Sequence, residues 1–490
     1  PYERNSEFFP VIQSLKTRIF DLKAKDSDDR KLEKIEDVLS NLSIDIRTAM
    51  PLLANLLSLN LPARSSYKLS SATSQVLRNR TMELLINIFR SMAIQNPVLF
   101  TIEGLQYADP STQEVLKMIL EQGAITGMFL LMTSRPEFKA EWSNRPSVMV
   151  LDLHRLSRRD AAKVVARAAG DKQLPEALVK RIVDETDGIP MYIEELTHAL
   201  LESGELRGNK ALRGTELANV HIPATLQESL AARLDKLGSA KTLLQVCSLL
   251  GREFSYKLLL AVSETDNEKA LKKELARIVD ADLLFKRSSG SELTYKFKHS
   301  LIQEAASQSL LKSSRKILHL RIAEAKESQF PEVIEQRPQK LAYHFAAGGV
   351  PEKAIKYWTI AGRRSVTRSA NLEAIEQAKA GLALVEKLPA SDSRNAMEVP
   401  LQSILGSALL GSKGYTAPEV RDVFTRAREL CEQIGTDEHL FQVLVGLWMY
   451  YEVSAHYADA LEVGSQLVRI ANASGNEGQL VQAHYARGFT

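Results

Sequence analysis

The sequence contains little cysteine and almost no net charge. Its 490 residues include two cysteines, Cys247 and Cys431, which lie far apart among apolar neighbours. This spacing excludes a disulfide framework and a CxxC metal site, and we expect two buried thiols in a reducing, cytoplasmic setting. Lys plus Arg number 63 and Asp plus Glu 60. The resulting net charge of +3 gives no reason to expect nucleic acid or a membrane surface as a partner.

Long apolar runs and a recognisable signal peptide are also absent from the sequence. A membrane helix needs ~18 consecutive apolar residues, and no segment approaches that length. The chain opens at Pro1 inside an amphipathic pattern and stops at Thr490 within another, QLVQAHYARGF. We therefore expect a fragment of a longer protein, with room for about two to four domains.

The spacing of apolar residues changes along the chain. Residues 1–97 mostly show helical spacing, as in KLEKIEDVL. Three short apolar runs follow, separated by helical stretches: VLFTI (Val98–Ile102), MFLLMT (Met128–Thr133) and VMVLDL (Val148–Leu153). Such runs predict central strands of a parallel sheet with helices on both faces.

After Leu156 the pattern is helical again, up to a polar link at about Glu205–Val220. Further on, LLFKRSS and LTYKFKH are joined by Gly290 and Ser291 and predict a β-hairpin. Helices that end in a hairpin are typical of a winged helix. A packed helix, HSLIQEAASQSLLKSSRK, continues the hairpin, so we do not expect DNA binding.

From about Gln339 onward the sequence is helical, rich in Ala and Leu, and repetitive. Tetratricopeptide repeats place a Trp, small residues and a closing Pro at set positions in about 34 residues. The residues that match are Trp358, Ala361, Gly362, Ala374, Ala378 and Pro389. Small residues let helix pairs stack closely, which predicts an α-solenoid that binds a protein partner. The predicted fold class is α/β followed by all-α.

The first apolar run leads into the stretch VLFTIEGLQYADPST. Glu103 follows the strand directly, where an acid at the carboxyl edge of a sheet holds Mg²⁺ beside nucleotide phosphates. An ordinary strand-end acid is the alternative. Gly104 occupies the next position, where a second acid would orient water. Asp109 and Pro110 predict a helix N-cap and the first helical residue.

The second run ends in MTSRPE, which brings Thr133 and Arg135 to the same predicted sheet edge. A hydroxyl and a guanidinium in that position suit contact with a terminal phosphate, although solvated strand-end residues would look the same. The sequence contains no G-x-x-x-x-G-K-[ST] loop, so a cradle for the phosphates is missing from these residues.

The motif EGLQYADPST resembles E-D-L-H-W-A-D-P-S-T of large bacterial signalling ATPases of the STAND/AAA class. The class includes regions attached to class III adenylate or guanylate cyclases and regulators of the LuxR/MalT type. Further stretches look like family landmarks in family order: SRPEF, DGIPMYIEEL, IPATLQESLAARLDKL, GREFSYKLL, LTYKFKHSLIQEAA, YWTIAGRRSVTRSANLEAI and GYTAPEV. The resemblance covers essentially the whole chain and favours the cyclase-associated branch.

The resemblance implies a domain order and a set of cofactors. It suggests a partial P-loop nucleotide-binding domain over residues 1–155 and a helical lid over 156–220. A winged-helix-like domain would span 221–335, and tetratricopeptide-like repeats 336–490. The implied cofactors are ATP or ADP and Mg²⁺, with the phosphate loop upstream of Pro1. In that class the strand that carries the phosphate loop lies beside the strand expected at Val148–Leu153. Because that neighbouring strand would be missing here, we expect residues 1–155 to be poorly stable.

The resemblance also implies roles for particular residues. Glu103 would be the metal acid and Arg135 part of the phosphate sensor. Gly188 and Pro190 would form a turn of the lid near the base, with simple helix punctuation as the alternative. His299 is similar to a winged-helix histidine that faces the phosphates, although a lone histidine in an apolar setting is more often structural.

The chain departs from the family motif at Gly104, Gln106 and Tyr107, where relatives carry Asp, His and Trp. General-base help is worth about 10²–10⁴-fold in rate, so we expect ATP hydrolysis to be weak or lost while binding survives. The leading hypothesis is a nucleotide switch and scaffold in a cytoplasmic signalling protein, with a cyclase as the effector. A LuxR/MalT-like transcription regulator and a pure scaffold with a dead nucleotide site are the alternatives. Homo-oligomer formation is left open.

Overall fold

The computed structural model describes the chain except for residues 1–5, 24–25, 62–73, 124, 171, 173, 203–224, 264–266, 290–291 and 436–438. The predicted polar link Glu205–Val220 and the turn residues Gly290 and Ser291 lie outside the described residues. The chain forms two compact units. One comprises Pro1–Met149 and Glu327–Thr490, and the other comprises Val150–Lys326. The predicted sheet region and the repeats therefore belong mainly to the same unit.

The first unit begins with the helices that were predicted for residues 1–97. They are α1 (Phe9–Ser14), a π-helical turn (Leu15–Ile19), α2 (Asp28–Asn41), α3 (Ile46–Leu57) and α4 (Ser74–Gln95). Ser27 and Asp45 cap α2 and α3 through their side-chain oxygens. The apolar faces of these helices form one core, which includes Leu15, Ile35, Met50, Leu53 and Phe89. Residues of α5 belong to the same core.

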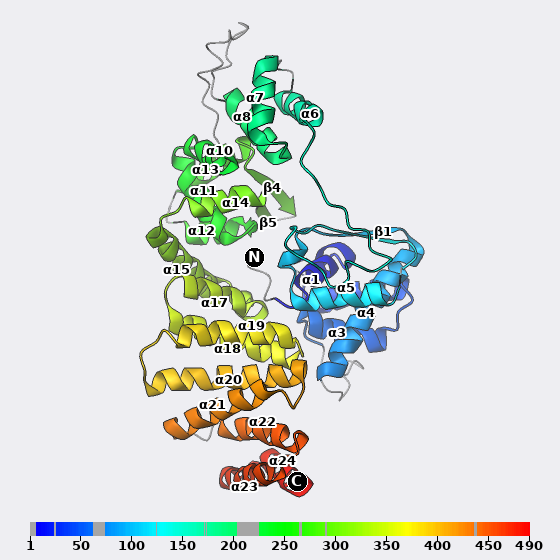
Figure 1. Cartoon of the computed structure of the whole chain (residues 1–490), viewed down its shortest axis with the longest axis vertical. Helices are drawn as coiled ribbons and strands as arrows, with labels where there is room; N and C mark the ends of the chain where they lie inside the picture. Colours follow the sequence, from blue (N-terminus) through cyan, green and yellow to red (C-terminus); the bar gives the residue numbers. More distant parts are fainter. Residues whose placement is uncertain are drawn as a thin grey trace. The chain divides into compact units, whose positions relative to one another are not determined.

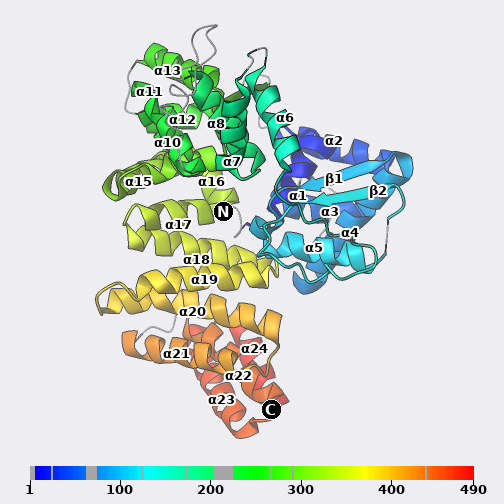
Figure 2. The ribbon, with the colours of Figure 1, turned by 45° about the horizontal axis from the view of Figure 1, so that its top comes forward.

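Two strands, β1 (Val98–Ile102) and β2 (Met128–Met132), form a parallel pair in the register Val98↔Met128 (Figure 2). A 3₁₀ turn (Leu105–Tyr107) and α5 (Pro110–Glu121) connect them. One face of the pair packs inward through Phe100, whose ring lies edge-on to Phe89 at 5.2 Å. On the other face Phe129 is 65% exposed. Among the described residues helices cover one face, so the prediction of coverage on both was wrong.

The third predicted strand, Val148–Leu153, is not a strand. The segment has no regular secondary structure, and Met149, Leu151 and Leu153 are 82%, 74% and 94% exposed. A strand needs a neighbour to satisfy its backbone groups, and in the described part of the chain none lies beside this segment. The apolar run alone could not reveal that lack.

The second unit contains two helical cores. Helices α6 (Arg158–Ala169), α7 (Glu176–Thr186) and α8 (Pro190–Glu202) pack around Val165, Ile182 and Ile193. The other core is formed by α10 (Leu226–Asp235), α11 (Ser239–Leu250), β3 (Glu253–Ser255), α12 (Tyr256–Val262), α13 (Glu268–Asp280), β4 (Leu284–Ser289), β5 (Glu292–Phe297), α14 (Ser300–Gln308) and α15 (Lys312–Gln329). The boundary between the units falls within α15, after Lys326. Strand β5 lies between β3 and β4, antiparallel to both. The β-hairpin is confirmed, and its assignment to a winged helix stays a prediction.

The repeat region is a row of helices in which consecutive members pack together (Figure 1). They are α16 (Pro331–Gln336), α17 (Pro338–Ala347), α18 (Pro351–Thr367), α19 (Asn371–Val385), α20 (Asp392–Lys413), α21 (Pro418–Ile434), α22 (Leu440–Val453), α23 (Tyr457–Ser474) and α24 (Glu477–Phe489). The predicted small residues Ala361, Ala374 and Ala378 are buried where helices meet. A Cβ on Gly362 would lie 2.9 Å from Ile404. The predicted row of stacked helices is therefore confirmed, and its assignment to tetratricopeptide repeats stays a prediction.

Two expectations about the chain's environment concern the cysteines and membranes. Cys247 and Cys431 are both buried free thiols, as predicted. Burial raises the pKa of the Cys247 thiol well above its ordinary value. In the described ranges, no helix combines the length and apolar character needed to cross a bilayer.

Candidate functional site

The predicted site residues Glu103 and Thr133 follow the paired ends of β1 and β2, Ile102 and Met132. The Thr133 backbone N donates to Ile102 O at 2.9 Å, and Leu105 N donates to Thr133 O at 2.8 Å. The Thr133 hydroxyl accepts from Gly104 N at 3.0 Å. The two strand ends therefore meet at one edge, as expected for parallel neighbours.

Gly104 stands where a second acid was expected, and it also has a local structural role. Its φ of +71° is left-handed, and it begins the 3₁₀ turn Leu105–Tyr107. An added Cβ would lie 3.2 Å from Tyr107 Cδ2. Asp and Asn tolerate left-handed backbone better than other non-glycine residues. An aspartate at this position is therefore feasible at some cost in strain.

Arg135 is exposed and contacts two motif residues. Its backbone N donates to Gln106 Oε1 at 3.3 Å, and its guanidinium lies 5.8 Å from the centre of the Tyr107 ring. Gln106 and Tyr107 are two of the three positions at which the sequence departs from the motif that it resembles. Both therefore help to place the predicted phosphate-sensing residue.

The edge offers few ligands for a metal ion. Glu103 is exposed, and no group of three or more His, Cys, Asp or Glu residues gathers to hold a metal anywhere in the described residues. Mg²⁺ is commonly held by one or two carboxylates together with waters and substrate phosphates. A single carboxylate fits that pattern only when phosphates supply the remaining ligands.

Asp109 caps α5 as predicted and also holds the start of the chain. Its carboxylate accepts from Thr112 N at 2.9 Å and from Thr112 Oγ1 at 2.8 Å. It further accepts from Phe8 N at 2.7 Å and Phe9 N at 3.1 Å. One buried carboxylate thus ties the motif to the first turn of α1.

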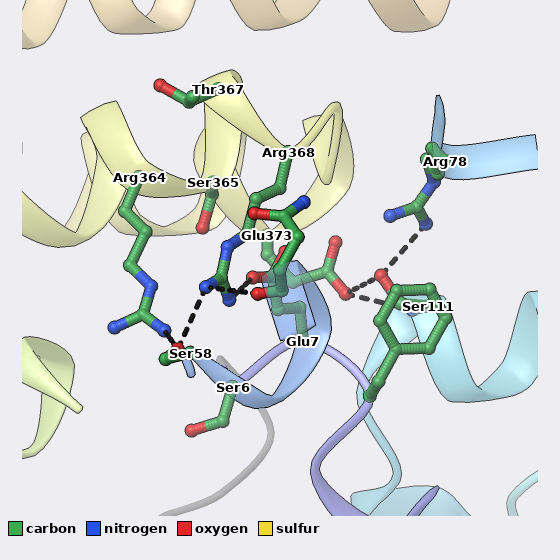
Figure 3. Close-up of polar contacts among 12 residues, drawn as sticks. Ser6, Glu7, Ser58, Arg78, Ser111, Arg364, Ser365, Thr367, Arg368 and Glu373 are labelled. Carbon is green, nitrogen blue, oxygen red and sulfur yellow. Dashed lines mark hydrogen bonds and ion pairs between the residues drawn. The ribbon is translucent and has the colours of Figure 1, made fainter. Parts of the chain in front are cut away.

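The first turn of α5 is also bound by the repeats (Figure 3). The buried Glu373 of α19 accepts from Ser111 N at 2.8 Å and from the Ser111 hydroxyl at 2.5 Å. Arg78 of α4 donates to the Ser111 hydroxyl at 2.8 Å and to Glu114 at 2.7 Å. The motif helix, α4 and the second helix of the first repeat are therefore joined by one polar network.

A second set of contacts joins the same two parts of the unit. Arg368 at the end of α18 forms an ion pair with Glu7 and donates to Asn55 O at 3.2 Å. Gln339 of α17 donates to the Ser6 hydroxyl at 2.6 Å. The motif-bearing part and the first repeats thus share a partly buried polar interface.

Sequence reasoning did not identify Glu373 or Arg368. Both lie in YWTIAGRRSVTRSANLEAI, where the pattern indicated only repeat packing. One signal was available, since Glu373 and Gln377 are charged and polar residues next to the small residues Ala374 and Ala378. Buried polar residues at such positions need partners, but the sequence does not say which.

Burial and the nearby charge of Glu373 raise the pKa of Asp109 to about 7, against four hydrogen bonds that favour the ionised form. Burial also raises the pKa of Glu373. An acid whose pKa is higher in the folded state adds stability that is present below its unfolded value and is lost as pH rises through the folded value. The interface should therefore be more stable in mild acid.

We expect the free energy of unfolding to rise by about 1 kcal/mol between about pH 8 and about pH 6 through Asp109. Urea unfolding at the two pH values measures this change in the free energy of unfolding. Asp109→Asn is the matched control, because asparagine also caps helices but does not titrate. The same pH slope in both proteins would contradict this assignment.

The remaining predicted site residues belong to the second unit. Gly188 has φ +70° and lies in the turn between α7 and α8, where an added Cβ would be 2.5 Å from Leu156 O. Pro190 is the first residue of α8. His299 precedes α14 as its N-cap residue, is partly buried, and makes no side-chain cap hydrogen bond. The turn geometry accounts for Gly188 and Pro190 locally, and the nucleotide roles of all three stay predictions.

Comparisons with known proteins found limited similarity. No family model matches the sequence. An uncharacterized protein of Rhizobium meliloti is 24% identical over 424 residues, covering 85% of this chain and 41% of that protein. The chain therefore spans less than half the length of that relative. One solved structure that matches is a Signal Transduction ATPase with Numerous Domains (STAND) protein with a tetratricopeptide repeat sensor, from Pyrococcus horikoshii. The match covers 95% of this chain and 72% of that chain, with 12% sequence identity and a TM-score of 0.39. A score of this size does not establish a common fold.

Proposed function

We propose that this chain is the nucleotide-controlled regulatory region of a signalling protein and that its helical repeats bind a protein partner. The observation that carries the proposal is the contact between Ser111 and Glu373. The loop from Glu103 to Asp109 leads directly into α5, and a repeat helix holds the first turn of α5. A change at the strand edge would therefore alter a contact made by the repeats.

In this proposal the strand edge faces the phosphates of ATP or ADP. Glu103 holds Mg²⁺, which neutralises phosphate charge when it is bound. Thr133 and Arg135 contact the terminal phosphate through a hydroxyl and a guanidinium. The phosphate loop that such a site requires is not among these residues, and nucleotide roles for Gly188, Pro190 and His299 stay predictions.

Glu103 is followed by Gly104 and not by a second acid, which supports binding without efficient hydrolysis. Such a region is a switch, because a nucleotide shifts a conformational equilibrium only through its different affinity for the two states. We propose a cytoplasmic adenylate or guanylate cyclase as the whole protein. A LuxR/MalT-like transcription regulator, or a scaffold with a dead nucleotide site, is the alternative.

Nucleotide binding and turnover by the intact protein that contains this region test the proposal. We expect Glu103→Gln to weaken Mg²⁺-dependent ATP binding by at least about tenfold. Glu137→Gln, an exposed acid in the loop after β2, should leave binding unchanged. Equal binding by all three proteins would exclude Glu103 from the site. Absence of nucleotide binding would favour the scaffold.

Restoring the second acid provides a separate test of hydrolysis. Gly104→Asp is expected to raise ATP turnover by about 10²-fold or more, since general-base help has that size. Thermal unfolding of the same variant reports the strain of the left-handed position. A properly folded variant with unchanged turnover would show that Gly104 is not what limits hydrolysis.

A further inference from the structure

A cationic pocket lies in the first unit, away from the strand edge. It encloses about 60 Å³ between the segment around α1, the end of α3 and helices α16 to α19. Four cationic side chains line it: Lys16 of the π-helical turn, Arg337 just before α17, and Arg364 and Arg368 at the end of α18. Among the described residues that line it, Glu7 is the single carboxylate, and Glu7 already pairs with Arg368. The pocket therefore carries an excess of positive charge.

The positive groups are held close together. Arg364 donates to the Ser58 hydroxyl at 2.9 Å and Arg368 donates to the same hydroxyl at 3.1 Å, so two guanidinium groups converge on one oxygen (Figure 3). Arg337 is placed by the Phe9 ring, with its guanidinium 4.8 Å from the ring centre. Two guanidinium groups that donate to one oxygen repel each other, and an anion placed between them offsets that repulsion.

The electrostatics of the pocket agree with its geometry. Burial, followed by the charges of Arg337, Lys31, Arg364 and Arg368, lowers the pKa of Lys16. Burial and Arg368 lower the pKa of Arg364 to about 10, although Glu7 opposes the shift. Both cations are therefore destabilised in their charged form, and a bound anion would reverse that effect.

We propose that this pocket binds a phosphate-sized oxyanion, either inorganic phosphate or the phosphate group of a small monoester. A cavity needs about 10–15 Å³ to hold one water, so this one has room for about four waters or for one tetrahedral anion. Guanidinium and ammonium groups on several sides provide the charge-assisted hydrogen bonds that phosphate prefers.

Such an anion would fasten the repeats to the motif-bearing part of the unit. Arg337, Arg364 and Arg368 belong to the repeat region, whereas Lys16 and Ser58 belong to the N-terminal helices. A ligand shared between them stabilises their contact by binding the docked state alone. This site does not depend on the nucleotide role proposed for the strand edge.

The test is calorimetric titration of the 490-residue chain with inorganic phosphate at constant ionic strength, supported by thermal unfolding. We expect saturable binding and a rise in unfolding temperature. Lys16→Gln and Arg364→Gln should each weaken binding by at least about tenfold. Arg363→Gln is the matched control, since Arg363 neighbours Arg364 on α18 but is exposed. A second titration with glycerol phosphate distinguishes a monoester from the free ion.

The variants also separate ligand binding from a purely structural role. Without phosphate, Lys16→Gln should keep or raise the unfolding temperature, because it removes a repelling charge. For Arg364→Gln the same relief is offset by loss of the hydrogen bond to Ser58. Circular dichroism checks that they fold. Absence of saturable binding of both phosphate and glycerol phosphate would overturn the proposal. The proposal would also be overturned if phosphate raised the unfolding temperature equally in the unchanged chain and in all three variants. An equal rise would reflect the general effect of kosmotropic salts.

Discussion

Gly446→Val is expected to destabilise the C-terminal repeats by about 3 kcal/mol or more, at the upper end of what overpacking a core costs. Gly446 of α22 faces the buried Phe424 of α21, and an added Cβ would lie 2.4 Å from Phe424 Cζ. From the other side, a Cβ on Gly406 of α20 would lie 2.6 Å from the same atom. The ring thus fills the space that two glycines leave open.

Phe424 cannot yield easily, since only 2% of it is exposed and it sits in the main core of the repeats. Valine at position 446 must therefore displace the ring or push α22 away from α21. In a stack of repeats the damage passes to neighbouring helices, because each interface supports the next. We expect the last helices, α22 to α24, to lose order first.

Urea unfolding followed by the fluorescence of Trp448, which lies in α22, measures this effect. Gly464→Ala is the control, since its added Cβ would make only ordinary contact, 3.4 Å from Arg487 Cα. Phe424→Leu combined with Gly446→Val should recover part of the lost stability by making room. Unchanged stability of Gly446→Val would show that α21 and α22 are not packed as described.

The repeats were predictable because their signal is local. Ala361, Ala374 and Ala378 stand at spacings set by one helix pair, and the structure buries all three. The edge residues Glu103 and Thr133 were predictable for a related reason. Each follows a short apolar run, and parallel strands bring their carboxyl ends to the same side.

The errors and omissions concern partners distant in sequence. Val148–Leu153 has the composition of a strand, but a strand depends on a neighbour that local spacing does not provide. The contact between Ser111 and Glu373 joins residues 262 positions apart, and no periodicity reports such a pairing. Gly104 was interpreted only as a lost acid, because a left-handed φ leaves no sign in the sequence other than the glycine itself.

Arg368→Met is expected to destabilise the first unit by about 3–5 kcal/mol, the cost of breaking a buried ion pair from one side. Arg368 and Glu7 have side chains only 17% and 10% exposed. Removing the guanidinium leaves the Glu7 carboxylate buried without its counter-charge. One of its oxygens, Oε2, already lacks a hydrogen-bond partner among the described residues. The same change also removes the hydrogen bonds to Asn55 O and Ser58 Oγ.

Glu7→Gln should rescue part of this loss. Replacing both members of a buried pair removes the stranded charge, so the double variant should be more stable than Arg368→Met alone. The coupling energy from the double-mutant cycle should reach about 1–3 kcal/mol, as for residues in direct contact. Arg363→Met, on the exposed face of the same helix, controls for the loss of positive charge.

Hydrogen exchange separates loss of the interface from unfolding of either part. If Arg368 and Glu7 hold the N-terminal helices against the repeats, Arg368→Met should accelerate exchange at the start of α1 and at the end of α3, where Asn55 and Ser58 accept from Arg368. Protection in α22 and α23 should stay the same, because those helices contact neither residue. A coupling energy near zero, or faster exchange spread evenly over the repeats, would mean that the pair does not hold the interface. In that case the interface would rest on the remaining contacts, which join Ser111 to Glu373, Gln339 to Ser6 and Arg364 to Ser58.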